Sequence, residues 1–453
     1  MRAALAVLGA AFLLIAGLVW WVKFEHRPPR ASLVGPVAVL GHDTPVSVVV
    51  RCDAPGLSTV TIRLRAGDTL YELLRETYPA PPWWGGSGVT ERTVHLQADL
   101  LPLHVPEGPA TLEVLVDSYA WHLFPPPAAP RLAVPLRVDL TPPRIELLTT
   151  QHAVRLGGVA VAIFRQSPDT VRSGIKVAQY FFPSTTGYFA DQNVALAFFA
   201  IPQDLTVDAK PRLLARDAAG NQREVDLPCH IRPRRFRHRT LAVSDAFLAR
   251  KVPEIEQENG LPVSADLVKG YLYINGELRR ENEATIRRLT ARSQPAALWN
   301  GAFVRQPNAA AVSAFADRRT YTYHGKVIDH QTHLGYDLAS LKMSPVAAAQ
   351  NGIVVFAGDL GIYGNAVILD HGLGIFSLYG HLSSIAVQQG QRVQAAQTLG
   401  QTGETGLAGG DHLHFSVMLF GVHVDPLEWW DAHWLREHVT RRLMRVPRAK
   451  PLS

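Results

Sequence analysis

The hydrophobic residues of this chain follow different spacings in successive regions. Residues 3–22 form one apolar run of roughly 20 uncharged residues, the length that a helix needs to cross a membrane. Farther along, apolar and polar side chains alternate, as in residues 46–52 and 60–64, and this period of two predicts half-buried strands bounded by turns. We therefore expect a mainly β chain behind an N-terminal transmembrane helix.

The N-terminal run is predicted to be an uncleaved anchor. Trp20 and Trp21 end it in the manner of an interfacial aromatic belt, whereas a cleaved signal peptide would have a shorter apolar core followed by small residues. Lys23, Arg27 and Arg30 follow the run, and the positive-inside rule alone would place that side in the cytoplasm. The sequence has no second span of comparable length, so the rest is expected to form soluble domains on one side of the membrane.

A second series of strands begins near Asp139 and ends in the sequence of residues 213–221, Leu-Leu-Ala-Arg-Asp-Ala-Ala-Gly-Asn. These two segments resemble the opening strand and a late hairpin of bacterial immunoglobulin-like modules. A helical region follows, in which Ser244 is expected to cap a short helix ending near Pro253, and residues 277–292 carry an amphipathic stripe. The predicted division is an anchor and juxtamembrane segment at 1–30, a β-sandwich module at 31–138, an Ig-like β-sandwich module at 139–232, a helical connector at 233–315, a histidine-rich domain at 316–430 and a basic tail at 431–453.

Composition narrows the class of protein. With 453 residues and 47% hydrophobic residues, the chain has ample apolar surface for several folded domains, which excludes wholesale disorder. A net charge of +6 suits a polyanionic neighbourhood such as a cell wall and does not imply nucleic acid. Two cysteines, Cys52 and Cys229, exclude a disulfide framework and a four-cysteine zinc site, and leave open either one bridge or two free thiols.

Histidines concentrate in the C-terminal part of the chain, where ten of the 18 lie between residues 324 and 438. His333 and Asp337 are separated by three residues, and His412 and His414 flank Leu413 in an alternating segment. Positions two apart on a strand point to one face, so His412 and His414 should project together. One can then bind a metal ion while the other faces its open coordination position.

These residues lie within a longer pattern of motifs. The stretch from about residue 317 to 430 resembles the lysostaphin-type zinc endopeptidases of peptidoglycan, through His333-x-x-x-Asp337 and His412-Leu-His414-Phe together with the segments 364–372, 379–383, 390–393 and 400–403. The resemblance implies an antiparallel β-sheet metallopeptidase domain with one Zn²⁺. It makes His333, Asp337 and His414 the zinc ligands and places His381 and His412, the catalytic candidates, beside the open position.

The sequence departs from this family in two places. Residues 407–411 read Leu-Ala-Gly-Gly-Asp where the family usually has Ser-Thr-Gly-Pro, and Ser416 stands where it usually has Glu. Asp411 beside His412 could orient that ring or raise its basicity. Which of His381 and His412 is the base, which bond is cut and whether the connector covers the groove stay open.

The function expected from the resemblance is that of a membrane-anchored zinc endopeptidase that hydrolyses amide bonds in peptidoglycan cross-links. That substrate places the soluble part in the periplasm or cell wall space, against the charge count at the anchor. The alternative is a non-catalytic wall-binding or amidase-activating envelope protein of the same fold. A further alternative is an envelope scaffold whose sandwich modules contact other envelope proteins or carbohydrate, with Trp83 and Trp84 as a stacking surface.

Overall fold

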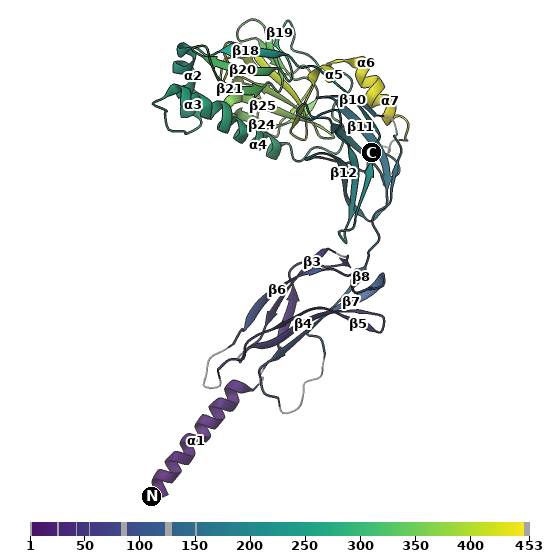
Figure 1. Ribbon diagram of the computed structural model, residues 1–453, viewed down its shortest axis with the longest axis vertical. Coiled ribbons are helices and arrows are strands. Elements are labelled where there is room, and N and C mark those ends of the chain that lie inside the picture. The colour runs from purple at the N-terminus through teal and green to yellow at the C-terminus, as the bar shows by residue number, and fades with distance from the viewer. Residues whose placement is uncertain are drawn as a thin grey trace. The chain divides into compact units, whose positions relative to one another are not determined.

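The computed structural model describes residues 2–24, 27–41, 43–53, 55–82, 88–122, 129–149 and 152–447 of the chain (Figure 1). The predicted Trp83–Trp84 surface lies outside these residues. The chain is mainly β, as predicted, and separates into two compact units: Met1–Pro143 with Asp169–Val171 and Arg216–Arg223, and Arg144–Pro168 with Arg172–Ala215 and Glu224–Ser453. The finer division into six parts stays a prediction.

The N-terminal apolar run folds as helix α1 (Arg2–Lys23). Among the residues that the structure describes, however, no helix combines the length and the apolarity that a membrane crossing requires. The predicted transmembrane anchor and the single-pass localisation built on it are therefore wrong. The sequence argument relied on the length of an uncharged run, and that length alone does not make a spanning helix.

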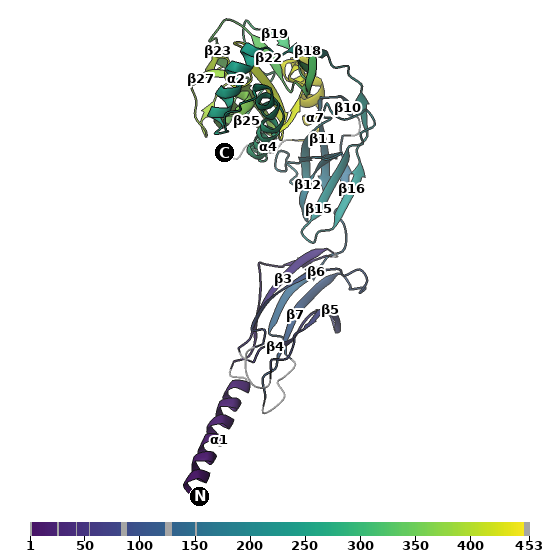
Figure 2. The same cartoon turned by 60° about the vertical axis from the view of Figure 1, so that its left-hand side comes forward.

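The first unit contains two sheets around one apolar core (Figure 2). Alternation along β3 (Thr44–Arg51) buries Val46, Val48 and Val50 and turns the intervening side chains outward, as the period of two predicted. One sheet has the order β1 (Arg30–Leu33), β3, β6 (Glu91–Ala98), and the other has the order β2 (Val39–Leu40), β8 (Leu132–Val138), β7 (Gly108–Ser118), β4 (Leu57–Ala66), β5 (Thr69–Thr77).

The second unit begins with another set of strands, whose core includes the buried rings of Phe164, Phe182 and Phe198. Cys229 in this unit and Cys52 in the first are both among the described residues, and no disulfide joins them. The resemblance to immunoglobulin-like modules stays a prediction. These strands form three sheets. The first has the order β14 (Val194–Ala200), β11 (Val159–Gln166), β9 (Ile145–Leu147), and the second has the order β13 (Tyr180–Pro183), β12 (Thr170–Val177), β15 (Arg212–Asp217), β16 (Gln222–Asp226). The third pairs β10 (His152–Arg155) with β17 (Cys229–Arg232).

The C-terminal part of the second unit is built on an eight-stranded antiparallel sheet, as the sequence predicted. Its order is β19 (Ala310–Ser313), β22 (Tyr336–Ala339), β30 (Leu413–Leu419), β26 (Ile375–Gly380), β25 (Asn365–Gly372), β24 (Gly352–Asp359), β28 (Arg392–Val393), with β31 (Val422–Val424) paired to β30. Two smaller sheets have the orders β18 (His238–Ala242), β20 (Arg318–Tyr323), β21 (Lys326–Thr332) and β23 (Pro345–Ala347), β29 (Thr398–Thr402), β27 (Leu382–Ile385).

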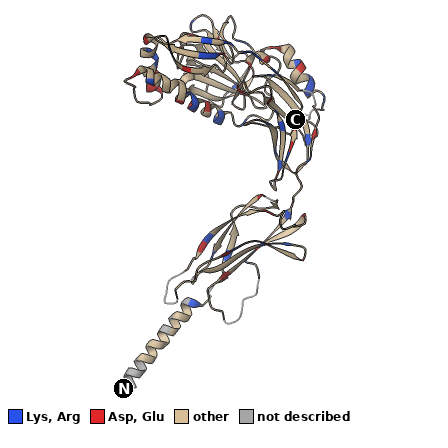
Figure 3. Cartoon of the chain, in the orientation of Figure 1, with Lys and Arg blue, Asp and Glu red and all other residues tan. Residues whose placement is uncertain are grey.

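Both faces of the large sheet are covered. Along β25, Val367 and Leu369 lie in the same apolar core as the phenylalanine rings described above. Ala366 and Ile368 face the other side and pack with the apolar residues of the preceding helices. Burial on both sides explains why this strand reads as a continuous apolar run. Charged residues concentrate on the covering helices rather than on the sheet (Figure 3). The helices are α2 (Asp245–Glu258), α3 (Leu267–Tyr273), η1 (Ile274–Leu278) and α4 (Arg279–Leu289), followed after the sheet by α5 (Pro426–Trp430), α6 (Ala432–Leu435), η3 (Arg436–Thr440) and α7 (Arg441–Leu443).

Helix α2 begins where the sequence predicted and ends later. Ser244 is its N-cap, and the Ser244 hydroxyl accepts a hydrogen bond from the backbone N–H of Phe247. Pro253 does not end the helix and lies inside it. The buried side chains of Leu248, Val252 and Ile255 lie on one stripe, and their packing outweighs the hydrogen bond that proline removes.

Glu428 on α5 yields a prediction about stability. Burial raises the pKa of its carboxyl to about 8, and its Oε2 accepts a hydrogen bond from the N–H of Val159 at 2.8 Å. The folded chain thus keeps a proton that the unfolded chain releases above its ordinary pKa of 4.5. The free energy of unfolding should fall by up to about 1.4 kcal/mol per pH unit as pH rises from that value, and level off above the folded pKa.

Glu428→Gln should remove this pH dependence and be more stable than the unsubstituted chain at pH 9. The measurement is denaturant unfolding of both proteins between pH 4 and pH 9. Glu281→Gln, at an exposed position of α4, serves as the control and should leave the curve unchanged. Parallel curves for the Glu428→Gln and unsubstituted proteins would contradict the prediction.

Candidate active site

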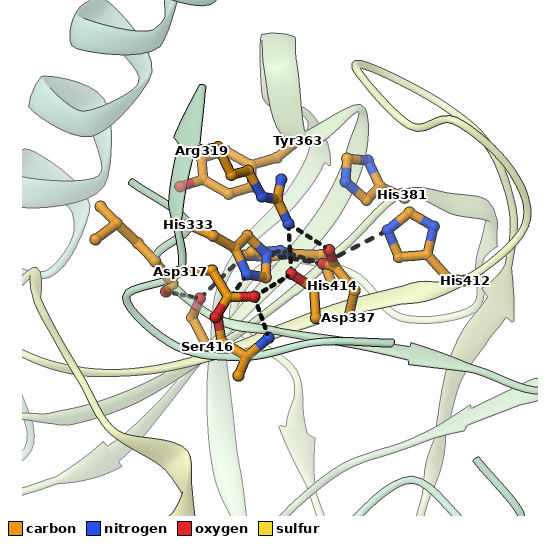
Figure 4. Close-up of polar contacts among 12 residues, drawn as sticks. Asp317, Arg319, His333, Asp337, Tyr363, His381, His412, His414 and Ser416 are labelled. Carbon is orange, nitrogen blue, oxygen red and sulfur yellow. Dashed lines mark hydrogen bonds and ion pairs between the residues drawn. The ribbon is translucent and has the colours of Figure 1, made fainter. Parts of the chain in front are cut away.

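Strand register brings the predicted site residues together. Asp337 on β22 pairs directly with His414 on β30, and on the other side of β30 the same histidine pairs with Gly380 at the end of β26. His381 follows Gly380, and His412 precedes β30 by one residue. Three neighbouring strands of one sheet, with the residues that directly adjoin them, therefore supply four of the five predicted side chains (Figure 4).

His333 reaches the same place from the loop after β21. Its ring Nδ1–H donates to the carbonyl oxygen of Ala314 at 3.0 Å, and its backbone N–H donates to the carbonyl oxygen of Asp317 at 3.0 Å. The carboxylate of Asp317 in turn accepts hydrogen bonds from Ser313 and from the N–H of Ala314. This short loop fixes the His333 ring so that Nε2 faces Asp337.

Three ligand atoms converge at this point. Nε2 of His333 lies 2.8 Å from Oδ1 of Asp337 and 3.0 Å from Nδ1 of His414, and the last two atoms are 3.0 Å apart. All three residues are buried, with exposed fractions of 4–8%. The structure thus places the predicted ligand set within reach of a single ion.

Hydrogen bonds outside the cluster determine where the ring protons are. Ser416 donates its hydroxyl proton to the carbonyl oxygen of Leu334 at 2.7 Å, so its oxygen must accept the Nε2–H of His414 at 3.1 Å. The Nδ1 of His414 therefore carries a lone pair. Because the Nδ1–H of His333 is used by Ala314, the Nε2 of His333 carries one too.

The cluster has the properties of a metal site. Two nitrogen lone pairs and a carboxylate oxygen lie 2.8–3.0 Å apart and repel one another unless a cation lies among them. A proton bridges only two of them, whereas a metal ion accepts all three lone pairs. Two imidazoles and one carboxylate with a further position open is the ligand set of catalytic zinc, and the spacing is close to the ~3.3 Å separation of ligands at tetrahedral zinc.

Electrostatics keep these groups in the states that bind metal. Burial would raise the pKa of Asp337, but the neighbouring histidines, His333 first, hold it well below its usual range. Burial lowers the pKa of His414 to about 4. Asp337 is therefore ionised and His414 neutral at neutral pH, which are the forms that a metal ion requires.

His381 and His412 lie beside the ligands, with their ring centroids 4.9 Å apart. His381 donates its Nδ1–H to the carbonyl oxygen of Thr405 at 2.8 Å, and His412 donates its Nδ1–H to that of Gly410 at 2.7 Å. Both rings thus turn Nε2 toward the cluster, and Nε2 of His412 is 3.5 Å from Oδ1 of Asp337 (Figure 4). Burial holds the pKa of His381 well below its ordinary value.

The backbone of His381 is strained in a way that serves this geometry. Its φ of 62° is in the left-handed region, which is uncommon for a residue with a side chain. The backbone N–H of His381 is held by the carbonyl oxygen of Tyr363 at 2.7 Å. Strain of this kind concentrates at functional sites, where the surrounding structure holds it in place.

The five residues line a cavity of about 460 Å³, named here the histidine cavity. Its other walls come from the connector and from β20, including Phe247, Tyr271, Arg279 and Arg319. Arg319 donates from Nη2 to Oδ2 of Asp337 at 2.9 Å and to the hydroxyl of Ser313 at 2.8 Å. The connector therefore forms one side of the cavity and leaves an open volume in front of the cluster.

Sequence reasoning misplaced or missed several supporting residues. Asp411 does not orient His412, because its carboxylate accepts from the hydroxyl of Thr402 and the N–H of Met343. Ser416 supports His414 and Arg319 supports Asp337, and neither role was predicted. Ser416 was recognisable only as a departure from the family pattern, two residues beyond His414. Arg319 lies in no sequence motif that would have identified its role.

The contact between Ser416 and His414 yields a second prediction. Ser416→Ala removes the acceptor that fixes the ring orientation and tautomer of His414, and metal affinity should fall roughly 10- to 100-fold. Competition with a chromogenic chelator measures this affinity directly. Ser383→Ala is the matched control, because that exposed hydroxyl bonds the carbonyl of Thr402 away from the ligands. Equal affinities for both variants would contradict the prediction.

Comparisons with known proteins agree with this arrangement. The sequence profile described as Peptidase family M23 matches residues 331–426. The chain is 36% identical over 107 residues to the DD-carboxypeptidase/endopeptidase Mpg of Neisseria meningitidis serogroup B, covering 24% of this chain and 25% of the relative. It is 29% identical over 161 residues to the peptidoglycan DD-endopeptidase ShyA of Vibrio cholerae serotype O1, covering 36% and 34%.

A third relative is matched along nearly its whole length. The chain is 36% identical over 94 residues to the lipoprotein NlpD of Yersinia enterocolitica, covering 20% of this chain and 96% of the relative. The matches to Mpg and ShyA, by contrast, span only a quarter to a third of those proteins. The profile match lies in the C-terminal part and includes all five site residues.

Proposed function

Because this chain belongs to peptidase family M23, with peptidoglycan endopeptidases among its relatives, we propose that it is a zinc-dependent endopeptidase that hydrolyses amide bonds in the peptide part of peptidoglycan. His333, Asp337 and His414 are the proposed zinc ligands, and His381 and His412 the proposed catalytic residues. The observation that carries the proposal is the convergence of two imidazole lone pairs and a carboxylate at 2.8–3.0 Å, with two further imidazoles facing them.

The proposed chemistry divides between the ion and the chain. When bound, zinc polarises a carbonyl and lowers the pKa of water. His381 and His412 each have Nδ1–H committed to a backbone carbonyl, so each offers only Nε2 to a substrate. A neutral Nε2 accepts the proton of an attacking water, and a protonated one donates to the developing oxyanion or to the leaving amine. The ring centroids are 4.9 Å apart, so both rings are close enough to act on one scissile amide.

The alternative function is that of a non-catalytic wall-binding envelope protein of the same fold. The similarity to NlpD, which is named a lipoprotein rather than a peptidase, is the observation in its favour. All five side chains of the proposed machinery are nevertheless present and line the histidine cavity. A protein that only bound the wall would have no need of them, and we therefore favour the enzyme.

The test is digestion of purified muropeptides, cross-linked and uncross-linked, by the full chain with and without a metal chelator, followed by mass spectrometry. The proposal expects products that carry one added water per cleaved amide, loss of products with the chelator and their return when zinc is restored. Absence of cleavage in the zinc-loaded protein, together with retained binding to the muropeptides, would favour the alternative.

A further inference from the structure

Three arginine side chains line the histidine cavity from segments outside the region that matches the peptidase profile. Arg239 lies on β18, Arg279 is the first residue of α4 and Arg319 lies on β20. The connector and the small sheet beside it thus bring three guanidinium groups to a cavity in which Asp337 and His414 come from the large sheet and His333 from the loop after β21. The family match assigns no role to any of them.

The positive charge of these groups is only partly compensated. Arg239 donates to the carbonyl oxygen of Val312 at 2.7 Å, and Arg279 donates to the backbone and side-chain oxygens of Asn275 at 3.1 Å and 2.5 Å. These partners are neutral, and neither arginine has a described carboxylate within ion-pair distance, although Arg279 lies close enough to the buried carboxylate of Glu283 to interact with its charge. The one carboxylate that lines the cavity is Asp337, which already faces His333, His414 and Arg319.

Arg319 adds an unmet hydrogen-bond donor. Its side chain is 18% exposed, and its Nη2 serves Ser313 and Asp337. Its buried Nε–H has no hydrogen-bond partner in the described part of the chain. A buried donor without a partner costs free energy that an oxygen atom of a ligand can recover. The wall of the cavity therefore combines positive charge with a buried N–H group that lacks a partner.

We propose that Arg239, Arg279 and Arg319 form a carboxylate-binding subsite that selects wall peptides by a free carboxylate near the scissile amide. This proposal rests on the proposed function and names the substrate class of that site. Guanidinium groups match the planar geometry and the charge of a carboxylate, and a divalent ion at the ligands would add further attraction for an anion. The peptide stems of peptidoglycan carry such groups at their C-termini and on side chains.

The two sources of the carboxylate can be distinguished by the substrate. One muropeptide substrate has all carboxylates free, a second has only its C-terminal carboxylate converted to the amide, and a third has only its side-chain carboxylates converted. The wild-type kcat/KM should be roughly 10- to 100-fold lower for the substrate that lacks the recognised carboxylate, mainly through KM. The amidated substrate that suffers this loss identifies the source.

Substitution of the arginines should abolish this discrimination. Arg279→Gln and Arg239→Gln should each lower the preference for the free carboxylate, and the double variant should bring it to within about threefold of unity. Arg279→Lys should keep part of the preference because it keeps the charge. Arg280→Gln is the matched control on the same helix, since Arg280 is exposed and pairs with Glu277. Melting temperatures identify any variant that fails to fold.

Equilibrium binding separates this proposal from the proposed function. The same three muropeptides are titrated onto the full-length His381→Ala variant, in which hydrolysis is not required. If the variant binds the three muropeptides with different affinities but the unsubstituted protein cleaves none of them, the carboxylate subsite is supported and the peptidase function is contradicted. Cleavage with equal kcat/KM for all three substrates, or a preference unchanged in the double variant, would overturn the subsite.

Discussion

Replacing His414 with alanine is expected to leave the purified protein without stoichiometric zinc and to lower kcat/KM on muropeptides by at least about 10³-fold. His414 supplies one of only three protein lone pairs in the cluster, and the remaining two atoms, on His333 and Asp337, cannot complete a catalytic zinc site. Elemental analysis of the purified protein and mass-spectrometric assay of muropeptide cleavage measure the two effects.

The melting temperature should reveal the loss of zinc binding in His414→Ala independently of catalysis. A ligand that binds only the folded chain stabilises it by about 2.7 kcal/mol at a concentration 100 times its dissociation constant. The unsubstituted protein should therefore melt at a lower temperature in chelator than in zinc, because the three lone pairs then face one another without a cation. The His414→Ala protein should melt at the same temperature in both.

His330→Ala is the appropriate control for His414→Ala. His330 lies on β21, three residues before a proposed ligand, but its exposed ring contacts the hydroxyl of Thr320 rather than the cluster. Zinc content, melting temperature and kcat/KM should all match those of the unsubstituted protein. Stoichiometric zinc and undiminished cleavage in His414→Ala would show that the ion, if required, binds elsewhere.

Local patterns predicted the parts of the site, but their assembly depends on long-range register. The spacing of His412 and His414 on a strand indicates a shared face without any knowledge of the fold. The pairing of Asp337 with His414 joins strands that are separated by more than 70 residues, and alternation of side chains does not specify which strands become neighbours. The family resemblance supplied that link.

Supporting contacts were missed because many of them are made by backbone atoms. The protons of His333, His381 and His412 are fixed by carbonyl oxygens, and every residue type has a carbonyl. Arg319 comes from a strand that precedes the matched region and approaches Asp337 only in the folded chain. A sequence pattern identifies side-chain chemistry and gives little information on such partners.

The errors in the fold have a related cause. The single-pass anchor was inferred from an uncharged run, and the end of α2 from one proline, Pro253. In the second case the buried contacts of Val252 and Ile255 continue the helix across the proline. Local propensity is a weak guide where tertiary packing decides the outcome. The antiparallel sheet of the C-terminal part was expected from the family resemblance, and burial on both faces explains the apolar pattern of β25.

His381→Ala and His412→Ala are expected to lower kcat by roughly 10²- to 10⁴-fold while the protein keeps its zinc. Neither ring is among the three converging ligand atoms, and each turns a single free nitrogen toward the space in front of them. Loss of one proton-transfer group should thus impair the chemical step without emptying the metal site. Zinc content and single-turnover cleavage of saturating muropeptide separate these effects.

The double variant distinguishes two proton-transfer roles from two structural ones. Groups that act on the same reaction are not additive, so His381→Ala/His412→Ala should be far less impaired than the product of the two single effects. Glutamine at either position keeps a hydrogen-bonding group but cannot relay a proton, and should rescue little activity. If instead the single variants lose zinc together with activity, the two histidines belong to the metal-holding set, and the division between ligands and proton-transfer residues fails.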